Sequence, residues 1–93
     1  MPKVVRIITT EHRDEVKRID RATIWGNPFI LHDESMRKAV CEAFEIYARD
    51  RLLIDPDWLE PLRGFDLACW CAPKQCHGDI ILKLLQERRL NEF

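Results

Sequence analysis

The sequence lacks the features of several large classes of protein. No stretch reaches the ~18–20 consecutive apolar residues of a membrane-spanning helix, so no membrane partner is expected. The first eight residues carry Lys3 and Arg6 within their apolar part, which is unlike a secretory signal, so a cytoplasmic protein is expected. Neither sign of charge is in excess, because 15 Lys and Arg stand against 16 Asp and Glu. The net charge of −1 excludes a generally basic nucleic-acid coat, although not a local basic face.

The chain also has no internal repeat, no low-complexity segment and no linker rich in Pro, Gly or Ser. Its 93 residues therefore predict a single domain over residues 1–93. Apolar residues make up 46% of the chain, which is ordinary for a globular protein and too high for a disordered one. A chain of this size buries only roughly 60–65% of its unfolded surface. A bound metal or a partner subunit, including a second copy of the chain, would therefore add useful stability.

Local patterns predict two strands and two main helices. Runs rich in β-branched and apolar residues predict strands over residues 4–9 and 65–71. Helical periodicity predicts helices over residues 33–53 and 76–90, the first capped by Asp33. The apolar face of the first helix is expected at five positions: Met36, Val40, Ala43, Phe44 and Tyr47.

Between these elements the patterns are weaker. Pro56 is expected to begin a short helix that ends at Gly64, and the charged residues 10–18 predict a loop or a turn of helix. An additional strand near residues 18–25 is an alternative. Because strands and helices alternate, we expect a small α/β domain with a short, mainly parallel sheet packed by two or three helices.

The densest chemical pattern is a group of three cysteines and one histidine within nine residues: Cys69, Cys71, Cys76 and His77. On a strand, Cys69 and Cys71 would point to the same face, about 6.5–7 Å apart. Three thiolates and one imidazole suit tetrahedral zinc, so these four residues are candidate metal ligands and zinc is the candidate cofactor. The spacing differs from common zinc fingers, however, and buried cysteines also pack as small apolar side chains. Both interpretations stay open here.

The same segment also lies where α/β proteins bind ligands. It follows the carboxyl end of a strand and opens a helix, whose N-terminus can lower a thiol pKa and attract anions. Cys76 is therefore a candidate nucleophile, with His77 as acid or base and Asp79 beside them. The alternative for Asp79 is that it only caps the last helix.

A second candidate region is the loop Trp25-Gly26-Asn27-Pro28-Phe29. The Trp25 ring and the Asn27 amide could hold a flat base by stacking and hydrogen bonding, with Arg21 contacting a phosphate. We therefore take four residues as candidate ligand-binding residues: Arg21, Trp25, Asn27 and Cys71. The alternative is that Trp25 and Phe29 anchor the loop to the core while Asn27 stabilises a turn.

These two regions together resemble a bacterial and phage family known as domain of unknown function 4326. The resemblance depends on the Trp25–Phe29 loop, and on Asp66–Cys71 followed by Cys76-His77-Gly78-Asp79. It covers roughly residues 19–86, and it implies that the two motifs belong to one module and form one site. The activity of the family is not established, so the resemblance implies no reaction.

Two hypotheses of function follow. The first is a ligand-binding or enzyme-like module whose single site takes a nucleotide, a nucleoside or a nucleic-acid end. The second is a zinc-stabilised module that binds a protein partner, for which the family context suggests a phage or mobile-element inhibitor of a host enzyme. The first requires thiols open to a cleft, whereas the second requires ligand atoms that converge on a metal.

Overall fold

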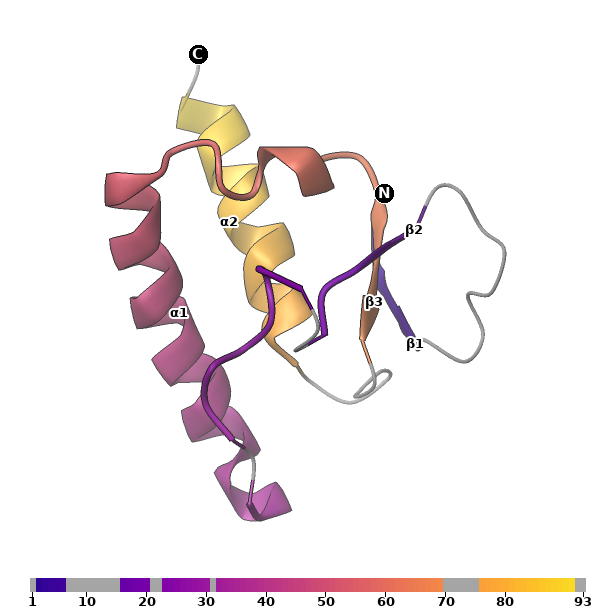
Figure 1. The fold of residues 1–93 in the computed structure, drawn as a ribbon, viewed down its shortest axis with the longest axis vertical. Coiled ribbons are helices and arrows are strands. Elements are labelled where there is room, and N and C mark those ends of the chain that lie inside the picture. Colours follow the sequence, from indigo (N-terminus) through magenta and orange to yellow (C-terminus); the bar gives the residue numbers. More distant parts are fainter. Residues whose placement is uncertain (1, 7–15, 21–22, 31, 70–75, 92–93) are drawn as a thin grey trace.

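The computed structural model describes residues 2–6, 16–20, 23–30, 32–69 and 76–91. Their main elements are β1 (Val4–Arg6), β2 (Val16–Arg18), α1 (Arg37–Ile54), β3 (Asp66–Cys69) and α2 (His77–Asn91). Figure 1 shows both helices on one side of the sheet, with α2 between the sheet and α1. The expected α/β fold is therefore confirmed. Within the described ranges, neither helix combines the length and apolar character needed to cross a membrane.

The sheet has the strand order β1-β3-β2, and both outer strands run parallel to β3. The pairing continues past the strand ends, because the Ile19 N–H donates to the Ala68 carbonyl at 3.0 Å. Parallel strands place their carboxyl ends at the same edge of a sheet. Ile19 and Asp20, which follow β2, therefore lie at the edge where β3 ends in Cys69.

The strand predictions are partly correct. Residues 4–6 and 66–69 form strands within the predicted ranges, whereas residues 7–9, 70 and 71 lie outside the described residues. The prediction of a loop or helical turn over residues 10–18 is wrong at its end, because Val16–Arg18 form β2. The additional strand expected near residues 18–25 exists, but it lies earlier and shares only Arg18 with that range, since the described residues after Arg18 form no strand. Two of the three β2 residues are exposed, so this edge strand lacks the apolar pattern of a buried one.

Helix α1 begins later than predicted. Asp33 caps a 3-10 turn at Glu34–Met36, accepting a hydrogen bond from the Ser35 N–H at 3.0 Å, and the α-helix follows from Arg37. The buried stripe is Cys41, Phe44, Ala48 and Leu52. Phe44 is buried, as expected for the predicted apolar face. Met36 is 47% exposed, because it lies in the 3-10 turn before the α-helix and its side chain does not point to the buried face of α1.

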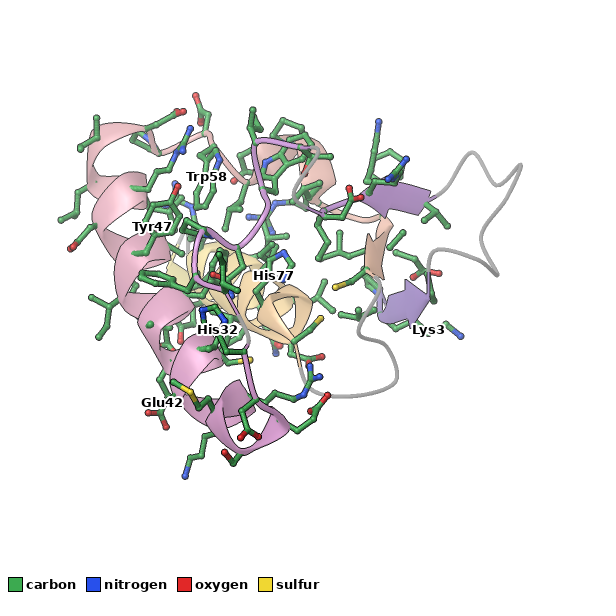
Figure 2. All side chains as sticks on the ribbon, turned by 60° about the horizontal axis from the view of Figure 1, so that its bottom comes forward. Lys3, His32, Glu42, Tyr47, Trp58 and His77 are labelled. Atoms are coloured by element: carbon green, nitrogen blue, oxygen red, sulfur yellow. The ribbon has the colours of Figure 1, made fainter. Side chains whose placement is uncertain are left out.

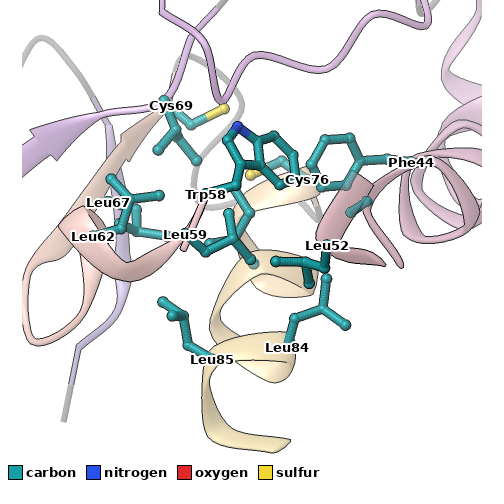
Figure 3. Packing of buried hydrophobic residues seen from close by; sticks show 13 residues of the cluster. Phe44, Leu52, Trp58, Leu59, Leu62, Leu67, Cys69, Cys76, Leu84 and Leu85 are labelled. Atoms are coloured by element: carbon teal, nitrogen blue, oxygen red, sulfur yellow. The ribbon is translucent and has the colours of Figure 1, made fainter. Parts of the chain in front are cut away.

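Residues 55–65 cross from α1 back to the sheet without forming a true α-helix. Turns lead into a single 3-10 turn at Glu60–Leu62, and Gly64 takes a positive φ of 84° where the segment ends. Trp58, Leu59 and Leu62 are buried. Figure 3 shows these three side chains in one cluster with residues of β3, α1 and α2, which includes Cys69 and Cys76.

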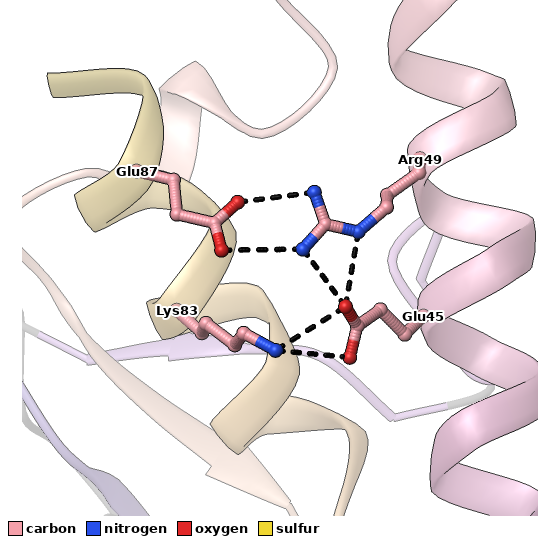
Figure 4. A network of polar contacts seen from close by, with 4 residues as sticks. All are labelled: Glu45, Arg49, Lys83 and Glu87. Atoms are coloured by element: carbon pink, nitrogen blue, oxygen red, sulfur yellow. Dashed lines mark hydrogen bonds and ion pairs between the residues drawn. The ribbon is translucent and has the colours of Figure 1, made fainter. Parts of the chain in front are cut away.

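A network of ion pairs joins the two helices outside this core (Figure 4). Arg49 of α1 contacts Glu45 on its own helix at 2.8 Å and Glu87 of α2 at 3.0 Å. Lys83 of α2 contacts Glu45 at 3.2 Å. Hydrogen bonds from Arg49 and then Lys83 lower the pKa of Glu45. The network fixes how α1 lies against α2, and α2 in turn positions the candidate site.

Candidate metal centre

The first half of the site comes from the end of β3. Residues two apart on a strand point to the same face, and both Leu67 and Cys69 belong to the buried cluster that the helices cover. Cys69 is the last residue of β3 and is buried. Its thiol therefore points from the carboxyl edge of the sheet into the core.

The second half comes from the first turn of α2, where Cys76 acts as the capping residue. The Gly78 N–H donates to Cys76 Sγ at 3.3 Å, and the Cys76 N–H donates to Asp79 Oδ2 at 3.1 Å. This reciprocal pair has the pattern of a capping box, with a thiol in place of the usual hydroxyl. The carboxylate of Asp79 therefore has the capping role that the sequence offered as its alternative.

His77 is held in one orientation by two contacts. Its Nε2 lies 2.8 Å from the backbone carbonyl of Ile19, 58 positions earlier in the chain. Its ring also meets the ring of Phe44 edge-on, with 5.0 Å between centroids. A carbonyl oxygen can only accept, so Nε2 carries the proton and the neutral ring keeps its lone pair on Nδ1. This is the arrangement found around metal-binding histidines, whose second nitrogen donates to a carbonyl or carboxylate.

These two halves bring three potential ligand atoms together. One atom each from Cys69, Cys76 and His77 lies within 4.8 Å of the other two, and all three residues are buried. The hydrogen bond with Cys69, together with burial, raises the pKa of the Cys76 thiol above its ordinary value. Without a metal Cys76 therefore stays protonated, whereas a coordinated cysteine loses its proton. The group could hold a metal ion.

Close packing at the start of α2 depends on Gly78. A Cβ atom at this position would lie 2.8 Å from Val4 Cγ2 and 2.9 Å from Ile19 Cδ1. Both distances are shorter than ordinary contacts between carbon atoms. The absence of a side chain thus lets α2 approach β1 and the end of β2, which brings His77 within reach of the Ile19 carbonyl.

The Trp25 loop is tied to a different part of the core. The Trp25 Nε1–H donates to the Trp58 carbonyl at 2.7 Å, and the Trp58 Nε1–H donates to the Ile24 carbonyl at 3.2 Å. Phe29 contacts Tyr47 edge-on at 6.3 Å. The anchoring role that the sequence offered as an alternative for Trp25 and Phe29 is present in the structure.

The two predicted motifs are connected through a series of aromatic rings. The ring of His77 contacts that of Phe44, Phe44 contacts Tyr47, and Tyr47 contacts Trp58. Figure 2 shows Tyr47, Trp58 and His77 in the space between α1 and the sheet. Trp25 thus reaches the Cys/His group indirectly, through Trp58 and the packed core.

Asn27 lines a shallow hollow on the outside of this loop. The hollow has a volume of about 250 Å³, and the residues around it are Thr23, Gly26, Asn27 and Pro28. Asn27 Oδ1 accepts a hydrogen bond from the Phe29 N–H at 2.9 Å, which is the turn-stabilising role considered from the sequence. The candidate residues Arg21 and Cys71 lie outside the described residues.

Sequence reasoning missed two groups at this edge of the sheet. The Ile19 carbonyl orients His77, but a backbone acceptor leaves no mark in the residue pattern. Asp20 is buried and pairs with Arg18 through Oδ2, while its Oδ1 has no hydrogen-bond partner among the described residues. No sequence signal pointed to Asp20 either, because the edge strand that precedes it was not predicted at Val16–Arg18.

The fold and site define a small α/β domain with a buried Cys/His group at the carboxyl edge of a parallel sheet. The chain belongs to the family described as a domain of unknown function (DUF4326), whose model matches residues 5–87. It is 35% identical over 94 aligned positions to an uncharacterized 12.4 kDa protein from the nrdA-td intergenic region of Enterobacteria phage T4. That match covers 98% of this chain and 86% of the phage protein. No solved structure matches the chain.

Proposed function

We propose that the chain is a zinc-stabilised binding module in which Cys69, Cys76 and His77 hold the ion. The observation that carries this proposal is the convergence of three buried ligand atoms, each within 4.8 Å of the other two. Two of the ligands open α2 and the third ends β3, so one ion would join the sheet to the helix that covers it. A small domain gains most from such a connection, because its apolar core alone contributes little net stability.

The surroundings of the ligands support zinc. The thiolate-rich donor set suits a soft or borderline ion such as zinc. The Ile19 carbonyl leaves Nδ1 of His77 free to coordinate, and the Gly78 N–H would stabilise a thiolate on Cys76. Structural zinc takes four ligands. We propose Cys71 as the fourth, because on a continued strand it would share the face of Cys69.

The role of such a centre is structural, and the binding surface lies elsewhere. Cys76 and His77 are only 3% and 6% exposed, which disfavours direct attack on a large substrate. The segment from Ile24 to Ile30 exposes apolar side chains, with Ile24 at 62% and Ile30 at 53%. Ile24, Phe29 and Ile30 are all exposed within seven residues of sequence, which makes this segment our candidate for a protein-binding surface. A protein partner, such as a host enzyme that a phage protein would inhibit, therefore suits this module.

Metal analysis of the purified full chain tests the proposal. We expect about one zinc per chain, and a thermal transition that moves far downward when a chelator removes the ion. Cys76→Ser should lose zinc although serine preserves the cap of α2, because Ser is a strong capping residue. Cys41→Ser is the matched control, since Cys41 is equally buried but lies outside the group. The proposal is overturned if the wild-type protein contains no metal and its thermal transition does not change when a chelator is added.

A second candidate function depends on the hollow beside Asn27. Its volume of about 250 Å³, with Thr23 and Asn27 among its lining residues, supports a small flat ligand such as a nucleoside, a nucleotide or a nucleic-acid end. Trp25, Asn27 and Arg21 would form this site, while catalysis by Cys76, His77 and Asp79 stays a prediction. Calorimetric titration with adenosine and guanosine monophosphates should show saturable binding that Asn27→Ala weakens at least tenfold. No heat with either nucleotide counts against this function.

A further inference from the structure

The two thiols of the metal centre are close enough to react with each other. The Cys76 thiol is hydrogen-bonded to the Cys69 thiol, and their sulfur atoms lie within 4.8 Å. Neither cysteine is part of a disulfide in the structure. A disulfide requires the sulfur atoms to approach to about 2.05 Å. The two residues therefore need only a small local movement to form a bond.

We propose that Cys69 and Cys76 form a redox-controlled pair, which releases the metal when a peroxide converts the two thiolates into a disulfide. This inference rests on the proposed zinc site. In the reaction, one thiolate attacks a peroxide oxygen, the O–O bond breaks with release of hydroxide, and a sulfenic acid forms. The second thiolate attacks that sulfur, forms the S–S bond and releases hydroxide. Two thiolates, hydrogen peroxide and two protons thus yield one disulfide, two waters and a free zinc ion.

The position of the pair gives the reaction a structural consequence. Cys69 ends β3 and Cys76 caps α2, so the disulfide would join the same two elements that the metal joins. His77 is not consumed, because its contacts to the Ile19 carbonyl and the Phe44 ring do not involve the sulfur atoms. The oxidised chain would therefore keep β3 and α2 connected after the ion has left. Metal and disulfide are two alternative crosslinks at one place.

The burial of the two cysteines determines which oxidants can reach them. Cys69 and Cys76 are 4% and 3% exposed, which admits a small oxidant more readily than a protein thiol or glutathione disulfide. Coordination keeps the sulfurs as thiolates, which are the reactive form. Cys41 is also buried, but among the described residues it lies outside the group of potential metal ligands. Peroxide should therefore act selectively at the centre.

The test uses the full chain loaded with zinc, whose metal content is measured before any oxidant is added. Hydrogen peroxide should release one zinc per disulfide formed, as read by a chromogenic chelator and by the loss of two hydrogens in the intact mass. Peptide mapping should show Cys69 linked to Cys76 in the wild type and in Cys41→Ser alike. Reduction with dithiothreitol should restore zinc binding. The oxidised, metal-free chain should melt at a higher temperature than the reduced, metal-free chain.

The outcomes separate this inference from the proposed function. A chain that holds no zinc before oxidation overturns the zinc site itself. A loaded chain that keeps its zinc under peroxide, or loses it without a disulfide, overturns only the redox pair. A disulfide that involves Cys71 or Cys41 also contradicts the assignment of the pair. The Cys71→Ser variant provides a second check, because the Cys69–Cys76 link should still form in it.

Discussion

At the residue scale, the absence of one side chain decides how closely the two layers meet. Gly78 is buried between Cys76, Val4 and Ile19, and these neighbours leave no room for a Cβ atom. A glycine in the first turn of a helix costs conformational entropy relative to alanine. The close approach of α2 to the sheet compensates for that cost, and it places His77 against the Ile19 carbonyl.

This argument predicts that Gly78→Ala destabilises the domain. The new methyl group would overlap Val4 Cγ2 and Ile19 Cδ1, which costs about 1–3 kcal/mol, while alanine recovers up to about 1 kcal/mol of helix propensity. Taking central values, the net loss of about 1 kcal/mol lowers the melting temperature by about 4–8 °C for a domain of this size. Differential scanning calorimetry of the two proteins measures it.

The double variant with Val4→Ala tests the cause. Val4→Ala alone should also destabilise, but in the Gly78→Ala background it removes one of the two overlapping atoms. The two effects should therefore sum to more than the loss of the double variant. Strict additivity, or a Gly78→Ala protein at least as stable as the wild type, contradicts the steric account.

At the scale of elements, the sequence predicted what depends on local pattern. The β-branched run of β1, the stretch before Cys69 and the periodicity of both helices identified the fold class and the neighbourhood of the site. The position of β2 was missed because its stability comes from pairing with β3 rather than from its own residues, two of which are exposed. The buried face of α1 differs from the predicted face because a 3-10 turn precedes the helix. A 3-10 turn has fewer residues per turn than an α-helix, so the positions before Arg37 do not continue the spacing of α1.

The candidate site also has one part that the local sequence predicted and one part that depends on the tertiary fold. The spacing of Cys69, Cys76 and His77 around one loop predicted that they meet, since a strand end and the next helix start are neighbours in an α/β unit. The contact of His77 with Ile19 was not predictable, because it joins two segments that only the sheet order brings together. Local sequence therefore specified the ligands, whereas the tertiary fold specified their orientation.

At the scale of the whole molecule, two groups of charges hold the outer elements to α2. Glu45 of α1 pairs with Lys83 of α2 and with Arg49 on its own helix. Glu60 of the crossing segment pairs with its neighbour Arg63 and lies 4.0 Å from Arg88 of α2. In both cases the hydrogen-bonded arginine is the main cause that lowers the pKa of the carboxyl group. A carboxyl whose pKa is lower in the folded state stabilises that state above its unfolded pKa. This stabilisation is lost as the pH falls through the folded pKa.

Acid unfolding should therefore depend on Glu45. Its ordinary pKa is 4.5, so its contribution is complete at neutral pH and declines below about that value. Glu45→Gln should reduce the free energy of unfolding at pH 7 by about 0.5–1 kcal/mol, a magnitude typical of partly exposed pairs in a network. The loss should shrink as the pH falls through the lowered pKa of Glu45 in the folded state, because protonation then removes the charge from the wild type. Urea unfolding followed by far-ultraviolet circular dichroism at each pH measures the difference.

A second variant separates this effect from loss of the proposed zinc, since protonation of the proposed cysteine and histidine ligands would also weaken the domain in acid. Glu42 lies exposed on α1, one turn before Glu45, and no ion pair is found for it within the described part of the chain. Glu42→Gln should leave the pH dependence of unfolding as in the wild type, because both proteins would lose metal over the same range. Only Glu45→Gln should show a deficit that disappears in acid. Equal behaviour of the two variants would mean that the ion pairs between α1 and α2 contribute nothing to the stability of the whole molecule.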